Sequence, residues 1–492
     1  MIAARAVPAA VSKEVRALLP LWLGCLVVVW AGGIRDHNLL FLRAGFVMYI
    51  VGSLALGALS VGHEYTNHTL PLLLSVPTSR RRIFAIKISV LLAMLVMLAG
   101  VALARLPLIP AGREMQDTAV VGGMSFLGGA FLAPWLTMLC RNPIAGAFFA
   151  LSIPAGLLLG SEIFSILVLA HAGTPAGEHV RMEIFWGGMV VVSAIGAFFS
   201  WRSFLKLQAI EGSHADLALP QWFSGSKAHG GVGGRRGSPV WMLVSKELHL
   251  QQLTFMVSAL YVGGWVAILS TWRSTVMTID QPFLILTVVH GSIVALLAGS
   301  LASAEERQLG TRDWQLLLPM STARQWLIKC GVVFGVVVVL GLALPALLAV
   351  LKPSIGPMRI NWGFAATLLI GAAVSLYVSS LSGSGLKALL IAVPAAFAVF
   401  PVLAVGEGAA FALIGLVRVP KAPFGLLTGY DDRVLALEAA VLMTLLLRFA
   451  LINHGSIDGD IKRVWRQLGL VVGLITLSAV AFMAAQMWVP QR

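Results

Sequence analysis

Residues 64–87 read EYTNHTLPLLLSVPTSRRRIFAIK, and residues 306–329 read ERQLGTRDWQLLLPMSTARQWLIK. The two segments align without gaps at an offset of 242 positions (306 minus 64), and their shared residues include a threonine and a proline. The matched pairs are Glu64 and Glu306, Thr69 and Thr311, Leu74 and Leu316, Pro77 and Pro319, Ser79 and Ser321, Arg82 and Arg324, and Lys87 and Lys329. Matches of this number at a single offset indicate an internal repeat.

The composition places both segments between membrane-spanning helices. The chain has 492 residues, of which 58% are apolar and only 11% are charged, and its mean hydropathy is +0.90. A soluble protein carries about 25% charged residues. Apolar runs long enough to cross a bilayer as helices recur from end to end. We therefore expect an all-α polytopic membrane protein with about 12–13 transmembrane helices. The predicted spans are 18–34, 39–62, 84–110, 118–140, 144–171, 182–201, 254–272, 283–303, 327–350, 362–381, 386–417, 434–452 and 467–488.

Further matches extend the repeat over most of the chain. Ser12-Lys13-Glu14 pairs with Ser245-Lys246-Glu247, and Pro154 pairs with Pro394. These anchors predict two six-helix repeats, each with an N-terminal amphipathic connecting helix. Because six is even, both repeats enter the membrane from the same side and are parallel. The predicted domains are a first unit at 1–212, a flexible cytoplasmic linker at 213–238, a second unit at 239–455 and an extra C-terminal transmembrane helix at 456–492.

The basic residues predict the orientation. Most of the 35 lysines and arginines fall in the segments that are cytoplasmic if the N-terminus is cytoplasmic, as the positive-inside rule requires. The net charge of +14 is then explained by loops that face an anionic lipid leaflet. No basic domain outside the membrane is predicted, so we expect no nucleic-acid partner. The span 386–417 contains Pro394 and Pro401, and it is either one helix or a broken one.

The segment around His63 resembles a zinc-protease motif only superficially. The zinc motif places two histidines four residues apart on one helical face, whereas His63 and His68 are five apart and point about 140° away from each other. The repeat has Glu305 and Gly310 at these positions. We therefore predict neither a metal site nor a catalytic site.

The repeated pattern E-x-x-x-x-T-x-x-x-L-L-x-x-P-x-S-x-x-R-x-x-x-x-K, which follows the second span of each unit, resembles the cytoplasmic segment of ABC transporter permeases of the second, exporter type (ABC-2). On charge alone, a membrane-hugging hairpin with basic anchors fits the same segment. The resemblance implies a coupling segment that docks on an ATP-binding subunit, and a connecting helix that carries a Lys-Glu pair. The implied coupling residues are Glu64, Thr69, Pro77, Arg82, Glu306, Thr311, Pro319 and Arg324, and the connecting-helix residues are Lys13, Glu14, Lys246 and Glu247.

The same resemblance implies the partners. The chain has no G-x-x-x-x-G-K-[ST] phosphate-binding loop, so it needs no cofactor itself, and ATP and magnesium are expected in two separate ATP-binding subunits. Two fused units imply one copy of this chain per transporter. We expect it in the bacterial cytoplasmic (inner) membrane, with its N-terminus in the cytoplasm and in contact with membrane lipid.

Polar residues within the apolar runs give the clues to the cargo. Arg43, Glu162, His290 and Glu407 lie in or near these runs, where a charge is costly and often functional. Glu162 is the best candidate for a pathway residue. Few other polar groups line the spans, which favours a hydrophobic or amphipathic cargo. An ion-coupled secondary transporter with parallel repeats is the alternative, and a membrane-embedded enzyme is the third hypothesis.

Overall fold

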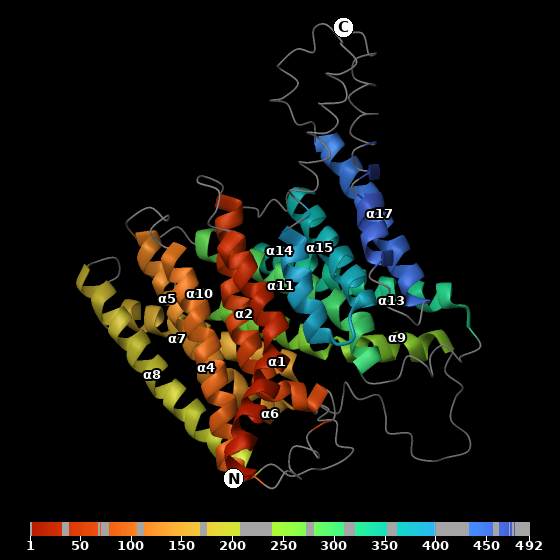
Figure 1. Ribbon diagram of the computed structural model, residues 1–492. Helices are drawn as coiled ribbons and strands as arrows, with labels where there is room; N and C mark the ends of the chain where they lie inside the picture. Colours follow the sequence, from red (N-terminus) through yellow and green to blue (C-terminus); the bar gives the residue numbers. More distant parts are fainter. Residues whose placement is uncertain are drawn as a thin grey trace, which may run out of the picture. The chain divides into compact units, whose positions relative to one another are not determined.

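The computed structural model describes a set of helices (Figure 1). The residues that it describes are 2–31, 39–66, 69, 78–105, 113–167, 175–206, 239–271, 280–308, 320–351, 362–397, 399, 432–455, 462–471, 473, 474 and 477. Within these ranges every regular element is a helix, and there is no strand. The apolar runs therefore form helices, in which backbone groups bond mainly to one another, as a bilayer demands.

Nine helices in the described ranges are long and apolar enough to cross a membrane. They are Ala10–Ala31, Gly45–Tyr65, Arg80–Ala104, Val120–Cys140, His179–Leu205, Gln252–Leu269, Leu286–Gln308, Thr322–Val350 and Gly363–Leu381. Three shorter apolar helices are Pro143–Leu158, Gly385–Phe397 and Ala439–His454. Every one of these helices overlaps a span predicted from the sequence, and the protein is an all-α, polytopic integral membrane protein.

The chain divides into two compact units, and the boundary between Arg236 and Gly237 falls inside the predicted linker. The linker itself lies outside the described residues. Unit 1 contains α1 (Ile2–Ala31), α2 (Leu39–Thr66), α4 (Arg80–Arg105), α5 (Arg113–Leu127), η2 (Gly128–Leu132), α6 (Ala133–Cys140), α7 (Pro143–Leu167) and α8 (Pro175–Leu205). Unit 2 contains α9 (Pro239–Leu250), α10 (Gln252–Thr271), α11 (Asp280–Gln308), α13 (Thr322–Val336), η3 (Val337–Ala343), α14 (Leu344–Val350), α15 (Trp362–Leu381) and α17 (Asp432–His454).

In unit 1, α2 is the central helix. It packs along α1, α4, η2, α6 and α7 (Figure 1). Small residues at this contact let the backbones approach closely, since Gly57 of α2 lies directly against the backbone of Gly129. Close packing of small residues is the main way in which helices associate within lipid, where burial of apolar surface gives little driving force.

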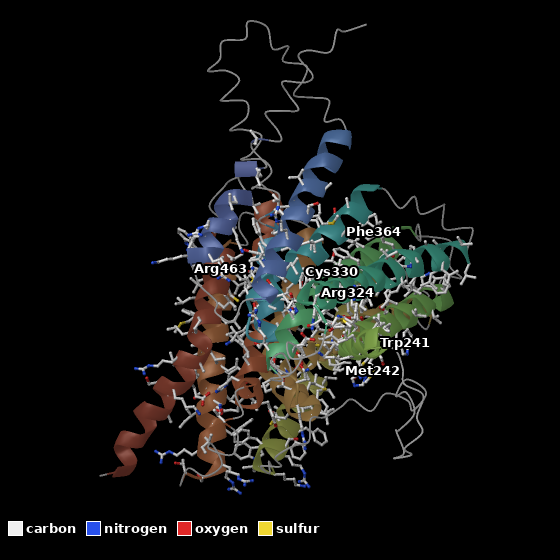
Figure 2. All side chains as sticks on the ribbon, turned by 90° about the vertical axis from the view of Figure 1, so that its right-hand side faces the viewer. Trp241, Met242, Arg324, Cys330, Phe364 and Arg463 are labelled. Carbon is white, nitrogen blue, oxygen red and sulfur yellow. The ribbon has the colours of Figure 1, made fainter. Side chains whose placement is uncertain are left out.

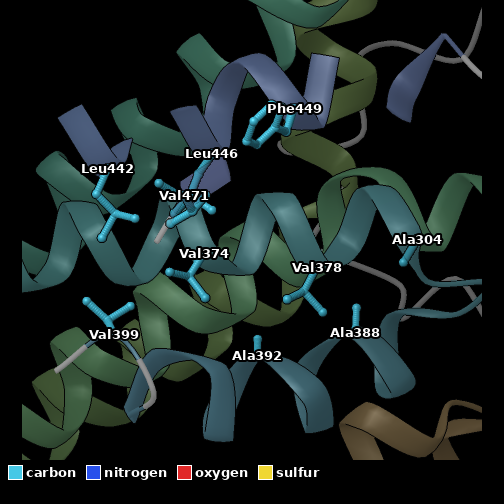
Figure 3. Close-up of a cluster of buried hydrophobic side chains, with 11 residues drawn as sticks. Ala304, Val374, Val378, Ala388, Ala392, Val399, Leu442, Leu446, Phe449 and Val471 are labelled. Carbon is cyan, nitrogen blue, oxygen red and sulfur yellow. The ribbon is translucent and has the colours of Figure 1, made fainter. Parts of the chain in front are cut away.

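In unit 2, α11 packs along α15, which in turn packs along α17. The core of this layer is a cluster of aliphatic side chains with one phenylalanine (Figure 3). Its buried members are Ala304, Ala373, Val374, Val378, Ala388, Ala392, Val399, Leu442, Leu446, Phe449 and Val471. Val471 comes from the C-terminal region, which places the start of the predicted extra helix in the core of unit 2.

The predicted connecting helices differ between the units. In unit 2 the connecting helix is separate, because α9 ends at Leu250 and α10 begins at Gln252. The side chain of Gln251 at this break donates to the carbonyl of Ala298. In unit 1 the predicted connecting helix and the first span form the single helix α1. The expectation of a separate element thus fits unit 2 but not unit 1.

A buried amide pair attaches the C-terminal helical segment 462–471 to unit 2. Gln467 donates to Asn453 Oδ1 at 3.1 Å, and Asn453 donates back to Gln467 Oε1 at 3.2 Å. The hydroxyl of Tyr377 donates to the same Gln467 oxygen at 2.9 Å. The sequence predicted this helix without explaining its role. In the structure, the start of this helix completes the polar and apolar packing of α15 and α17.

Replacement of Gln467 by Leu tests this attachment. The variant removes the partner of two buried polar groups, so we expect the free energy of unfolding to fall by about 1–3 kcal/mol. The measurement is the thermal unfolding midpoint of the detergent-solubilised protein. Leu470→Ala is the control, because Leu470 is exposed on the same segment. Equal midpoints for the two variants would show that the amide pair adds nothing.

Candidate functional site

Three helices of unit 1 bring charged residues together at one point. The middle of α1 supplies Lys13 and Glu14, the last turn of α2 supplies Glu64, and the second turn of α4 supplies Lys87. Glu14, Glu64 and Lys87 are buried, whereas the side chain of Lys13 is 52% exposed. We call these four residues, together with His63, the unit 1 network.

Lys87 is the centre of the unit 1 network. Its Nζ donates to both carboxylate oxygens of Glu14, at 2.9 and 2.8 Å, and to Glu64 Oε1 at 3.3 Å. It also donates to the carbonyl oxygen of Ser60 at 3.3 Å. Lys13 approaches Glu64 Oε1 from the exposed side at 2.9 Å. The ammonium of Lys87 therefore links all three helices.

Two further groups position Glu64. Nε2 of His63 lies 3.1 Å from Glu64 Oε1, while Nδ1 of His63 contacts the carbonyl of Leu59 at 2.8 Å. A carbonyl can only accept, so Nδ1 carries a proton. Thr69, which follows α2, donates its hydroxyl to Glu64 Oε2 and its backbone N–H to the Glu64 carbonyl. Thr69 thus contacts Glu64 directly and caps the end of α2.

Unit 2 contains the same arrangement, which we call the unit 2 network. Lys246 of α9 lies 2.5 Å from Glu306 Oε1, at the end of α11. Lys329 of α13 lies 2.7 Å from Glu306 Oε2 and 3.2 Å from Glu247 Oε1. The ammonium of Lys329 also donates to the carbonyl of Ala302. Glu247, Glu306 and Lys329 are buried.

The two networks correspond residue by residue: Glu64 and Lys87 pair with Glu306 and Lys329 at the offset of 242, and Lys13 and Glu14 pair with Lys246 and Glu247 at an offset of 233 (246 minus 13). The carbonyls that accept from Lys87 and Lys329 belong to Ser60 and Ala302, which are themselves 242 positions apart. The following helices also begin alike, because residues three and four positions after Ser79 and Ser321 donate to the carbonyls of those serines. The same sequence offset therefore produces the same local structure in both units.

The electrostatics of the networks are nearly balanced. Two lysines face two carboxylates in each unit, and the interior lysines are almost inaccessible to solvent. In unit 2, burial raises the pKa of Glu247 to about 7, against the opposing attraction of Lys329. A buried ion pair is tolerated only if its hydrogen bonds are well satisfied. The bond of each interior lysine to a backbone carbonyl satisfies one further donor of the ammonium.

The networks differ at one position, where unit 1 has His63 and unit 2 has Glu305. Donor atoms of Glu14, His63 and Glu64 all lie within 4.8 Å of one another, so this group has the geometry to hold a metal ion. However, Lys87 Nζ already lies 2.8 Å from Glu14 and 3.3 Å from Glu64. A second cation among these carboxylates would face the repulsion of the ammonium. The geometry favours an ion-pair network over a metal centre.

The structure brings together some predicted site residues and not others. Lys13, Glu14, Glu64 and Thr69 join the unit 1 network, and Lys246, Glu247 and Glu306 join the unit 2 network. Arg82 and Arg324 are exposed on the first turns of α4 and α13, away from the buried lysines. Pro77, Thr311 and Pro319 lie outside the described residues, as does the side chain of Glu162 in α7.

The sequence prediction omitted the two residues on which the networks depend. Lys87 and Lys329 were matched as repeat positions but received no site role. The available signal was a lysine inside an apolar run at the same place in both units, where an isolated charge requires a partner. The sequence could not identify that partner, because Lys87 and Glu14 are 73 residues apart in the chain.

The connecting helix of unit 2 has an apolar exposed face beside the network. Trp241 and Met242 of α9 are 65% and 67% exposed, and Figure 2 shows them next to each other on this helix. Glu247, on the other face of α9, is buried. A helix with one apolar exposed face and one face fixed by an ion pair is typical of an element at a membrane interface.

No protein-family model, no curated protein and no solved structure matches this chain.

Proposed function

We propose that the protein is the transmembrane permease subunit of an ATP-driven exporter of the ABC-2 type. The observation that carries this proposal is the duplicated network. In each unit it fastens the connecting region, the end of the second long helix and the start of the next long helix around one buried lysine. The segments 67–77 and 309–319, which resemble coupling segments, begin directly after the networks.

The networks give such segments a mechanical role. A force on segment 67–77, which follows Glu64, is transmitted to α1 through Lys13 and to α4 through Lys87. The helices then move together rather than one at a time, as the rigid-body motion of alternating access requires. A tether that only held a loop at the membrane surface would not need the same buried contacts in both units.

The proposal includes the following architecture. The two units are parallel six-helix repeats, the N-terminus and both coupling segments are cytoplasmic, and the membrane is the bacterial cytoplasmic membrane. Two ATP-binding subunits supply ATP and magnesium, and one copy of this chain forms the complete pathway. The cargo is hydrophobic or amphipathic. An ion-coupled secondary transporter remains the alternative, although no contact described above favours it.

Isolation of the protein with its partner tests the proposal. The chain is purified from native membranes in mild detergent, and co-purifying proteins are assayed for ATP hydrolysis. We expect an ATP-binding subunit at two copies per chain. Transport into vesicles should require ATP and should be unaffected by collapse of the ion gradients. Failure to recover any ATPase, or transport that follows an ion gradient, would contradict the proposal.

Neutralisation of the network glutamates provides the matching mutational test. Glu64→Gln and Glu306→Gln keep the shape of the side chain but weaken charge-assisted bonds to two lysines. Such bonds contribute about 1.5–3 kcal/mol each, so we expect ATP-dependent transport to fall roughly tenfold or more in each variant. Glu183→Gln, at an exposed position on α8, is the control and should transport normally. Wild-type transport in both network variants would assign the networks a purely structural role.

A further inference from the structure

A stripe of polar and aromatic residues runs along one buried face of α10. Thr254, Ser258, Tyr261 and Trp265 occupy positions i, i+4, i+7 and i+11, so they share one side of the helix. All four are buried. The remainder of α10 is apolar and contains no lysine, arginine, aspartate or glutamate. A polar stripe in such a helix is costly unless its groups find partners.

His290 of α11 faces this stripe. Its ring stacks on the ring of Tyr261, with 4.1 Å between the ring centroids and 8° between the ring planes. The hydroxyl of Tyr261 shares a hydrogen bond of 3.0 Å with Thr287, one turn before His290. The histidine is 3% exposed. These contacts fix the ring between the two helices.

The π-helical segment η3 determines which nitrogen of His290 carries the proton. In η3 the N–H of Leu344 bonds to Val339 rather than to Leu340, so the carbonyl of Leu340 loses its usual donor. The next candidate donor is residue 345, which is a proline and has no N–H. His290 Nε2 lies 3.1 Å from this carbonyl. Because a carbonyl only accepts, Nε2 donates, and Nδ1 of the neutral ring is an acceptor.

Two polar atoms of this region remain buried with no hydrogen-bond partner among the described residues. They are the acceptor Nδ1 of His290 and the donor Nε1–H of Trp265. Leaving a buried donor or acceptor unsatisfied costs about 1–3 kcal/mol. Native structures satisfy nearly all such groups, so Trp265 on the stripe and His290 facing it each have a hydrogen-bonding atom to which the described residues supply no partner.

Unit 1 lacks the residues that match His290 and Thr287 of unit 2. The residue 242 positions before His290 is Met48, which is buried and cannot make the same bond. The residue 242 positions before Thr287 is Gly45. The two units are alike at their ion-pair networks but differ at this position. A difference of this kind is expected if one unit contains a ligand contact and the other does not.

We infer that the stripe of α10, which includes Trp265, and the facing His290 of α11 bind an amphipathic ligand through an uncharged hydroxyl group. A hydroxyl both donates and accepts, so it suits the acceptor His290 Nδ1 and the donor Trp265 Nε1–H. An ester accepts but cannot donate, and a carboxylate would find no cation on α10. The apolar residues of α10 beside the stripe suit a hydrocarbon body. That this ligand is the exported cargo rests on the proposed function, whereas its binding does not.

The proposed ligand contact and the unit 2 network lie on the same helix, α11. His290 and Glu306 are 16 residues apart on α11, about 24 Å at 1.5 Å per residue. One helix therefore has the proposed ligand contact near its beginning and the unit 2 network at its end. A shift of α11 caused by ligand binding at His290 would also move Glu306, which contacts Lys246 and Lys329.

Binding of radiolabelled oleyl alcohol to the purified full chain in lipid nanodiscs tests the inference. Empty nanodiscs correct for partition into lipid. We expect one saturable site, which unlabelled oleyl alcohol blocks and which methyl oleate or oleate blocks at least several-fold less well. Trp265→Phe and His290→Phe each remove one hydrogen bond and should weaken binding about 3- to 10-fold. Met48→Leu, at the matching position of unit 1, should bind as wild type does.

The outcomes separate clearly. If there is no saturable binding above empty nanodiscs, or if both variants bind with wild-type affinity, the inference is wrong and ordered water satisfies these atoms. If methyl oleate competes equally with oleyl alcohol, the hydroxyl is not recognised and the inference is also wrong. If His290→Phe does not fold, the conservative Trp265→Phe variant still decides the question. The assay contains neither ATP nor an ATP-binding subunit, so its result is independent of the proposed function.

Discussion

Lys87→Met and Lys329→Met should each lower the free energy of unfolding by about 3–5 kcal/mol, because each variant leaves two buried carboxylates without their shared cation. Methionine has nearly the length of lysine, so the change leaves little cavity. In unit 1, Glu14 then loses both of its short bonds, and Glu64 keeps only its contacts with Lys13, His63 and Thr69. The loss is electrostatic rather than a loss of packing.

The measurement is thermal unfolding of the detergent-solubilised chain, combined with denaturant titration. Lys13→Met is the matched control, since its side chain is half exposed and an exposed pair contributes only about 0–1 kcal/mol. A second variant, Lys87→Met combined with Glu14→Gln, removes the charge that Lys87 leaves behind. It should be less destabilised than the sum of its single changes, because directly bonded residues are not additive. If Lys87→Met unfolds at the same temperature as Lys13→Met, the interior lysine does not hold the helices together.

The sequence predicted the membrane class and the helices well, because both depend on local composition. Twenty apolar residues in a row have few options in a bilayer other than a helix. The repeat also matched Glu64 with Glu306 at an offset of 242, and Lys13 with Lys246 at an offset of 233 (246 minus 13), before any geometry was known. The resemblance to a permease family placed Glu64 and Thr69 in one segment but predicted no contact between them, and the structure shows that the Thr69 hydroxyl donates to Glu64.

What the sequence could not predict are contacts between distant segments. Nothing local indicates that Lys87 bonds to a glutamate 73 positions earlier, or that Gln467 bonds to Asn453 and Tyr377. A polar residue in an apolar run indicates that a partner exists, but the partner depends on how the helices pack. The interpretation of His63 was incomplete for the same reason. Helical geometry correctly separated it from a zinc motif, but only the fold shows that it contacts Glu64.

The π-helical segments are a second feature that the sequence left open. Both η2 and η3 are followed by a proline at the second position of the next helix, Pro134 and Pro345. Proline in a predicted span indicates a local irregularity, but its form depends on the surroundings. In unit 2 the orphan carbonyl accepts from His290. In unit 1 the carbonyl of Gly129 lies against Gly57. The same backbone irregularity therefore has a polar partner in one unit and a small residue in the other.

Gly57→Ala and Gly299→Ala should have the second-largest effects on stability. The two positions are 242 residues apart and lie at the closest helix contacts of their units. A methyl group at Gly57 would overlap the carbonyl oxygen of Gly129, and one at Gly299 would lie 2.6 Å from Ser375 Cβ and 2.8 Å from the carbonyl oxygen of Ala372. Because the opposing atoms include backbone, the helices must separate. We expect a loss at the upper end of the about 1–3 kcal/mol typical of overpacking, or more.

Gly100→Ala and Gly331→Ala are controls within the same chain. Both glycines are helical, and a methyl group at either position meets no atom within 4 Å. Alanine is favoured over glycine within a helix by about 0.5–1 kcal/mol, so the controls should be neutral or slightly more stable than wild type. Replacement of glycine by alanine is thus expected to lower the free energy of unfolding at Gly57 and Gly299, and to leave it unchanged or raise it slightly at Gly100 and Gly331. Unfolding midpoints of all four variants in one detergent decide the matter. If Gly57→Ala unfolds at the same midpoint as Gly331→Ala or at a higher one, α2 and η2 are not in close contact. The centre of unit 1 would then not be closely packed.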